Sequence, residues 1–211
     1  MPKQASAKQP TTGYQFKITL NDSSPVIWRW IVIPRNATFF ELHLAIQGAM
    51  GWTESHLHAF RILEKGSRTP ISIEFPNSES EGDYLDERRE KIADYFGEKI
   101  KECQYEYDFG DGWEHTILFE RETALDQKEK YPKCTDGQNA CPPEDCGGIG
   151  GYHDLIDILR DSKHSEHENM LEWLDIDDSK EFDPTVFDPD DAFFEDPKKR
   201  LKEYEKGFGV V

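Results

Sequence analysis

The sequence predicts an α+β fold with a β-grasp-like core, in which two β-hairpins form a mixed sheet packed by several helices. Two pairs of strand-like runs, each pair joined by turn residues, lie at 14–33 and 105–120, and a helix with a clear start lies between them. Two further strand-like runs follow the helix. Hairpin, helix, strand, strand is the order of a β-grasp unit. An acidic helical insertion and a C-terminal tail complete the predicted architecture.

The first hairpin is predicted over residues 14–33. Residues 14–20 alternate apolar with polar side chains, residues 21–25 (Asn-Asp-Ser-Ser-Pro) supply a turn, and residues 26–33 resume the strand pattern. Both faces of the second strand are apolar apart from Arg29, so we expect this strand to be covered on two sides.

A helix is predicted to follow the first hairpin. Thr38 and Glu41 have the spacing of a capping box, apolar residues then recur at helical spacing, and Gly51 is placed to end the helix. Strands are then expected over residues 56–63 and 71–75, because a Glu-Lys-Gly-Ser turn separates two apolar runs.

Residues 76–102 have the composition of an acidic insertion. Their second half, residues 84–99, predicts an amphipathic helix with Leu85, Ile92, Tyr95 and Phe96 on its buried side.

The second hairpin consists of residues 105–109, a glycine turn at 110–112 and residues 113–120. Three helices are expected after it, at 152–161, at 166–174 and at 190–204. The second of these is predicted to open with a capping box formed by Ser165 and Glu168.

The length of the chain predicts its domain organisation, and its net charge limits the kinds of partner that it can bind. The 211 residues predict a disordered tail over 1–12, a single domain over 13–205 that includes the insertion and a Cys, Pro and Gly-rich loop at 134–151, and a C-terminal end over 206–211. The chain has 43 acidic against 25 basic side chains, a net charge of -18. Broad nucleic-acid binding needs clustered Lys and Arg, so this balance argues against nucleic acid as a partner.

No apolar run approaches the roughly 20 residues of a membrane-spanning helix, and the first dozen residues are polar, so we expect a cytoplasmic protein without membrane contact. In a reducing compartment its four cysteines are expected to be free thiols or metal ligands.

Two clusters of polar residues predict a pocket. His56 and His58 alternate on an expected strand and so share one face, and the segment from Asp108 to His115 places carboxylates and an imidazole around the glycine turn. If the two clusters are neighbours, their imidazoles and carboxylates form a ligand set for a divalent metal that activates water. The simpler interpretation makes His115 a hydrogen-bonded core residue.

Cys134, Cys141 and Cys146 form a third cluster. Three thiols in a loop held by prolines and glycines could bind zinc with a fourth ligand, or could be free thiols in a loop that only shapes the start of the next helix. Glu144 and Asp145 of the same loop are further candidates for the pocket.

Together these motifs make the chain resemble the plasmid pRiA4b open-reading-frame-three family, whose members are accessory or passenger genes on plasmids and other mobile elements and also occur on chromosomes. The resemblance covers most of residues 14–205. It rests on Tyr14-Gln15-Phe16-Lys17-Ile18, Pro25-Val26-Ile27-Trp28-Arg29, the helix end with Leu42-His43, Ile46-Gln47 and Ala49-Met50-Gly51-Trp52, His56-Leu57-His58 with Phe60, Tyr107-Asp108-Phe109-Gly110-Asp111, Trp113, His115, the Cys-Pro-Pro-Glu-Asp-Cys-Gly-Gly loop, Gly151-Tyr152 and the Phe-Asp-Pro tail. The resemblance implies an α+β domain with a β-grasp-like core and carries no biochemical activity with it.

The sequence therefore predicts an intracellular binding or regulatory accessory domain that takes a small molecule or a protein. The alternatives are a metal-dependent hydrolase acting on a small or nucleotide-like substrate and a zinc-stabilised protein-interaction module. The predicted pocket consists of His56, His58, Asp108, Asp111, Trp113, His115, Glu144 and Asp145.

Overall fold

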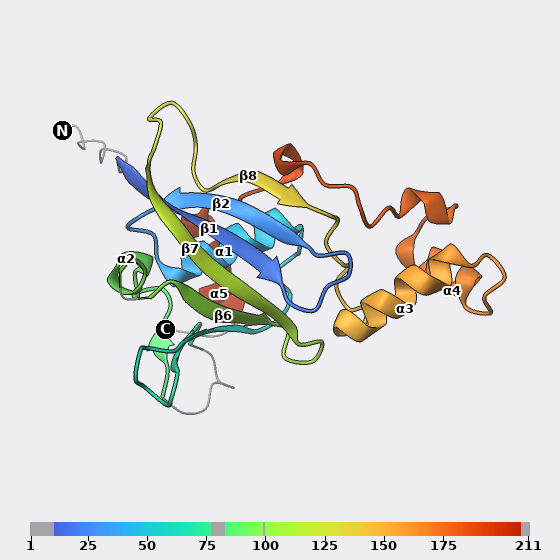
Figure 1. Cartoon of the computed structure of the whole chain (residues 1–211), viewed down its shortest axis with the longest axis horizontal. Helices are drawn as coiled ribbons and strands as arrows, with labels where there is room; N and C mark the ends of the chain where they lie inside the picture. Colours follow the sequence, from blue (N-terminus) through green and yellow to red (C-terminus); the bar gives the residue numbers. More distant parts are fainter. Residues whose placement is uncertain (1–10, 77–82, 99, 208–211) are drawn as a thin grey trace.

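The computed structural model describes residues 11–76, 83–98 and 100–207, and within them the strands form one open sheet with helices on one face and at one end (Figure 1). Most of the predicted N-terminal tail (1–10), part of the insertion (77–82) and the last residues (208–211) lie outside the described residues.

The sheet has eight strands in the order β5-β4-β3-β6-β7-β1-β2-β8. All neighbours are antiparallel except β4 and β5, which are parallel, so the predicted mixed sheet with two hairpins is confirmed. The strands are β1 (Thr12–Leu20), β2 (Trp28–Pro34), β3 (His58–Ile62), β4 (Ile71–Glu74), β5 (Leu85–Asp86), β6 (Glu102–Tyr107), β7 (Trp113–Ala124) and β8 (Lys133–Gln138).

The β-grasp prediction holds for the order of the elements and not for their pairing. The hairpin of β1 and β2 does not pair with β3 or β4, because the hairpin of β6 and β7 lies between them and pairs with β1 on one side and β3 on the other. Order along the chain does not fix such long-range pairing.

Helix α1 (Phe39–Met50) packs on one face of the sheet and begins and ends as predicted. The Thr38 hydroxyl accepts the Glu41 N–H at 3.2 Å, the Glu41 carboxylate accepts the Thr38 N–H at 2.8 Å, and Gly51 ends the helix at φ 87°. Removing such a cap costs about 1 kcal/mol, so the start of α1 is fixed locally.

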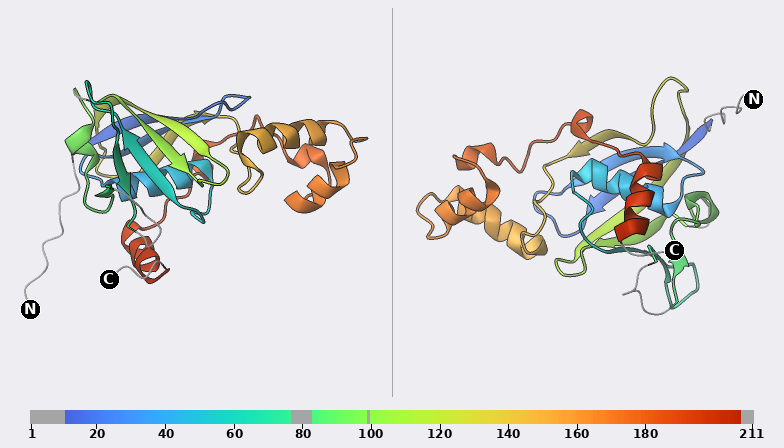
Figure 2. Two further views of the ribbon diagram at one scale, coloured as in Figure 1. Left: turned by 90° about the horizontal axis from the view of Figure 1, so that it is seen from below. Right: turned by 180° about the vertical axis from the view of Figure 1, so that it is seen from behind.

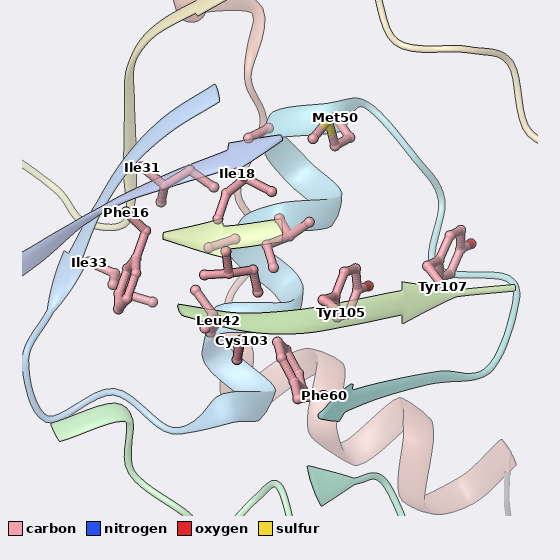
Figure 3. Packing of buried hydrophobic residues seen from close by; sticks show 14 of the residues in the cluster. Phe16, Ile18, Ile31, Ile33, Leu42, Met50, Phe60, Cys103, Tyr105 and Tyr107 are labelled. Carbon is pink, nitrogen blue, oxygen red and sulfur yellow. The ribbon is translucent and has the colours of Figure 1, made fainter. Parts of the chain in front are cut away.

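The core lies between this helix and alternate residues of the strands (Figure 3). Phe16 is fully buried and meets Phe96 edge to face at 4.8 Å, and burying such a side chain stabilises the fold by roughly 2 kcal/mol. The opposite face is polar. Trp28 and Trp30 of β2 lie on it half-exposed, so the expectation that β2 is covered on both sides is wrong.

The predicted helix at 84–99 is also wrong. Only α2 (Ile92–Tyr95), a single turn, is helical, while Leu85 lies in β5 and is 39% exposed. Ile92 and Phe96 are buried as expected. Glu87, between β5 and α2, lies fully buried and contacts His58, where an exposed helix face was expected.

Helices α3 (Gly148–Arg160) and α4 (His167–Leu174) form a pair that extends from one end of the sheet (Figure 2). We call this pair the arm. It has a small core of its own, formed by Leu155, Leu159 and Leu171. The Ser165–Glu168 capping box is not formed, because α4 begins after Glu166 without a side-chain cap.

After the arm, the chain passes through two short 3-10 turns, η1 (Ser179–Glu181) and η2 (Pro189–Asp191). It then contacts α1, where the Phe193 N–H donates to the Gly48 carbonyl at 3.2 Å, and forms α5 (Pro197–Gly207), the last described element. Tyr204 of α5 packs on Phe40 and Phe75. In the described part of the chain, every helix is too short or too polar to span a bilayer.

Candidate functional site

Three loops meet at the end of the sheet nearest the arm. Loop 1 (51–57) connects α1 to β3, loop 2 (108–112) is the turn between β6 and β7, and loop 3 (139–147) connects β8 to α3. Most of the predicted pocket residues lie on these loops or beside them.

His56 of loop 1 lies between two carboxylates. Its Nδ1 is 3.6 Å from Asp108 Oδ2 of loop 2, and its Nε2 is 3.1 Å from Asp145 Oδ1 of loop 3. Within the described residues, these three form the one group of three or more His, Cys, Asp or Glu residues whose ligand atoms all lie within 4.8 Å of one another. We call this group the His56 trio.

Both aspartates of the trio have a left-handed backbone conformation. Asp108 has φ 54° and Asp145 has φ 60°, a region that Asp tolerates better than most residues. Oδ1 of Asp108 accepts a hydrogen bond from the Gly110 N–H at 2.9 Å, and the other carboxylate oxygen, Oδ2, faces His56. Side-chain exposure rises from 11% at Asp108 through 29% at His56 to 68% at Asp145, so the trio opens to solvent on the side of loop 3.

Glu144 does not face the trio and instead ties loop 3 to loop 1. Its Oε2 accepts the Thr53 N–H at 2.9 Å and the Thr53 hydroxyl at 2.5 Å, and its Oε1 accepts the Tyr107 hydroxyl. Burial, and then the neighbouring Glu144, raises the pKa of Tyr107, so the phenol stays protonated and donates. Trp52 stacks on Tyr107 and donates from Nε1 to the Pro142 carbonyl at 3.0 Å.

Asp111 ties loop 2 to loop 3 in the same way. Its Oδ2 accepts the Gly147 N–H at 3.1 Å. Gly148, at φ 68°, lies so close that a Cβ there would be 2.2 Å from the Asp111 carbonyl oxygen. The two loops can therefore approach only because residue 148 has no side chain.

Trp113 and His115 lie beneath the loops, in the core. Both are fully buried, and His115 Nδ1 is 3.0 Å from the Trp113 carbonyl oxygen. Burial lowers the pKa of His115 to about 4, so its ring is neutral at pH 7. This placement agrees with the core interpretation of His115.

His58 belongs to a different site, because His56 precedes β3 and so does not alternate with His58 on that strand. His58 Nε2 lies 2.8 Å from Oε2 of the fully buried Glu87. The His58 ring stacks on that of His43, whose Nδ1 is 2.8 Å from the Tyr105 hydroxyl. Of the three histidines predicted for the pocket, only His56 therefore lies at the three loops.

Gln47 joins this buried network by donating from Nε2 to the Tyr105 hydroxyl at 3.0 Å. The sequence analysis had His43 and Gln47 only in the helix motif of the resemblance, without a role in a site, and it missed Glu87. His43 and Gln47 stand four residues apart on the buried face of α1, and polar residues at helical spacing within an apolar stripe are a signal that could have found them. Glu87 had no such signal, because its segment has the pattern of an exposed acidic helix.

The three cysteines of the predicted zinc cluster lie apart from the trio. Cys134 is buried in β8, and Cys141 and Cys146 are half-buried in loop 3. Burial raises the pKa of each thiol, to about 12 at Cys146, while the Arg29 guanidinium opposes that shift at Cys134 and Cys141. Zinc binding would have to overcome this cost of forming thiolates, and it stays a prediction.

The fold and the loops define an α+β domain with a polar site at one end of an open sheet. The chain belongs to the family of plasmid pRiA4b ORF-3-like proteins, whose model matches residues 12–191, as the resemblance implied.

Two relatives are similar over most of the chain. The uncharacterized protein y4hQ of Sinorhizobium fredii (strain NBRC 101917 / NGR234) is 36% identical over 160 residues, which are 75% of this chain and 79% of y4hQ. The crystal structure of MM3350 from Methanosarcina mazei Go1, a protein of unknown function, matches with a TM-score of 0.78 and 38% identity over 88% of this chain and 99% of MM3350.

Proposed function

We propose that this protein is a binding or regulatory accessory module whose three-loop site holds a divalent cation on the His56 trio. The observation that carries the proposal is the contact between His56 and Asp145. His56 Nε2 is shielded from solvent and lies 3.1 Å from a carboxylate oxygen, but the two atoms do not have hydrogen-bond geometry. A cation shared by a ring nitrogen and a carboxylate oxygen satisfies both lone pairs.

The donor set suits such an ion. One imidazole nitrogen and two carboxylate oxygens are the ligands that Mn²⁺, Zn²⁺ and related ions accept in proteins. Separations of up to 4.8 Å between the donor atoms match atoms arranged around one centre. As metal ligands, two carboxylates bring a formal charge of -2, which a divalent ion neutralises.

Hydrogen bonds within and between the three loops hold these ligands in position. Asp108 is fixed by the Gly110 N–H, and loop 3 is fixed through Glu144 and Asp111. Such supporting contacts orient metal ligands and commonly contribute 10–100-fold to affinity. Because Asp145 is largely exposed, an ion on the trio would keep coordination positions open to an oxygen atom of an incoming ligand.

Isothermal titration of the full chain with MnCl₂ and with ZnCl₂ tests the proposal. We expect one ion per chain, and we expect His56→Gln and Asp108→Asn each to weaken binding at least about tenfold. Asp157→Asn removes one carboxylate from an exposed position on α3 and is the matched control, with wild-type affinity expected. No saturable binding, or equal affinity in all variants, would overturn the proposal.

A metal-dependent hydrolase is the second candidate, and one observation favours it. Three protein ligands with open positions are typical of catalytic metal sites, whereas structural sites are closed by a fourth. This candidate predicts Mn²⁺-dependent hydrolysis of p-nitrophenyl phosphate or a nucleoside triphosphate that Asp108→Asn abolishes. Stoichiometric metal binding without hydrolysis would leave the binding module as the function.

A further inference from the structure

A hollow of about 340 Å³ lies between the two helices of the arm. Its wall on α3 is formed by Leu155 and Ile158, and its wall on α4 by Met170 and Trp173. Each pair has a spacing of three residues, so both helices present a short apolar ridge toward the same space.

The apolar wall of the hollow is incompletely covered. Leu155 is buried, but Trp173 is 45% exposed. A Trp side chain offers a large apolar surface, and burying it on binding provides strong anchoring, which is why Trp is enriched at binding hot spots. The hollow is thus shaped to receive an apolar side chain from outside.

The rim and the outer surface of the arm are acidic. Asp145 and Asp154 stand at the hollow, and further exposed acidic side chains continue along both helices at Asp157, Asp161, Glu168 and Glu172. Arg160 and Lys163 are the basic residues of this segment. A ligand that covers the apolar wall would therefore meet a negative surface extending well beyond it, which attracts a cationic partner.

We propose that the hollow binds a basic, amphipathic segment of a partner protein. An apolar side chain of the segment enters between Leu155 and Trp173, and its Lys or Arg residues pair with Asp154 and with the acids that follow along α3. A peptide segment fits better than a small cation, because only an extended ligand reaches acidic residues spread over two helices. Asp145 of the trio also lines the hollow, but the proposal is tested at Trp173 and Asp154, which are not among the trio.

Fluorescence anisotropy with the full chain tests the proposal. The probe is a fluorescein-labelled helical peptide of about 14 residues with leucines on one face and lysines on the other, at about 0.15 M NaCl. We expect saturable binding with a Kd below about 100 µM, weakened about tenfold by Trp173→Ala and by Asp154→Lys. Met170→Gln is a second variant of the wall with the same expected direction, and circular dichroism checks that each variant is folded.

The controls separate a specific site from general charge attraction. Glu102→Lys makes the same charge change at an exposed position on β6, outside the arm and the hollow, so we expect a loss of less than about threefold. A peptide with alanines in place of the leucines is expected not to bind. Equal losses in Asp154→Lys and Glu102→Lys, equal binding of the alanine peptide, or no saturable binding would each overturn the proposal.

Discussion

The imidazole ring of His43 lies flat against that of His58, with ring centroids 3.5 Å apart and an angle of 4° between the planes. Both rings are buried, and each has its own partner, the Tyr105 hydroxyl for His43 and the Glu87 carboxylate for His58. Burial, and then the electrostatic interaction with the His58 ring, lowers the pKa of His43 well below its usual value. His43 is therefore neutral at pH 7.

Removing the carboxylate of Glu87 is expected to destabilise the protein strongly. Glu87 is fully buried, and deleting one partner of a buried pair leaves the other without compensation, at a cost of about 3–5 kcal/mol. Urea unfolding of Glu87→Ala measures this loss. The control is Glu129→Ala, which breaks an ion pair between Lys133 and Glu129 whose side chains are 45% and 48% exposed, with an expected loss below about 1 kcal/mol. Equal losses would contradict a buried pair.

Stability is expected to fall as the pH drops from about 6.5 toward 4. The unfolded His115 takes up a proton below its ordinary pKa of about 6.5, whereas the folded residue does so only below about 4, so acid favours the unfolded chain. The loss is fully developed near pH 4 and amounts to about 3 kcal/mol. His115→Gln should flatten the dependence of unfolding free energy on pH between 6.5 and 4.5. His164→Gln changes an exposed imidazole, and the same slope in both variants would refute the assignment to His115.

Replacing each of two glycines of α3 with alanine is expected to change the stability of the protein in opposite directions. At Gly148, the Cβ would collide with the Asp111 carbonyl and the backbone has φ 68°, so Gly148→Ala should cost about 1–3 kcal/mol and weaken cation binding on the trio. At Gly150 a Cβ meets open space, so Gly150→Ala should stabilise the helix by about 0.5–1 kcal/mol. Thermal unfolding of both variants checks the pair, and similar effects would show that the contact between loops 2 and 3 is not tight.

The prediction that Cys134, Cys141 and Cys146 bind zinc can be tested by the melting temperature of the protein. If the thiols hold a structural ion, chelation with EDTA should lower the Tm of the wild type by several degrees and leave Cys141→Ser, which has already lost the ion, unchanged. Elemental analysis of both proteins should then show zinc only in the wild type. A wild-type Tm that EDTA does not change would refute the prediction.

Features with a local cause were predictable from the sequence. The capping box at Thr38 and the left-handed Gly51 depend on neighbours within four residues, and the two hairpins depend on alternation and turn residues. His56, Asp108 and Asp145 were candidates from the sequence for separate reasons: His56 for its spacing to His58, Asp108 for its place at the glycine turn and Asp145 for its place in the Cys, Pro and Gly-rich loop.

Features that depend on long-range pairing were not predictable. Nothing in residues 84–99 indicates that Glu87 faces His58, 29 positions away, or that β6 and β7 separate β1 from β3. The grouping of the trio likewise required the three loops to meet, which the chain order leaves open. His58 was assigned to the wrong site because its strand begins two residues later than the pattern indicated.

Because the arm has a core of its own, it can unfold locally. Leu155, Leu159 and Leu171 pack mainly with one another and with nearby residues of the same segment, so little of their burial depends on the main sheet. Such a unit can unfold by itself while the sheet stays closed, and its amides should exchange with deuterated solvent sooner than those of β6 and β7. Because α3 starts directly after loop 3, each opening would reach the loop that carries Asp145.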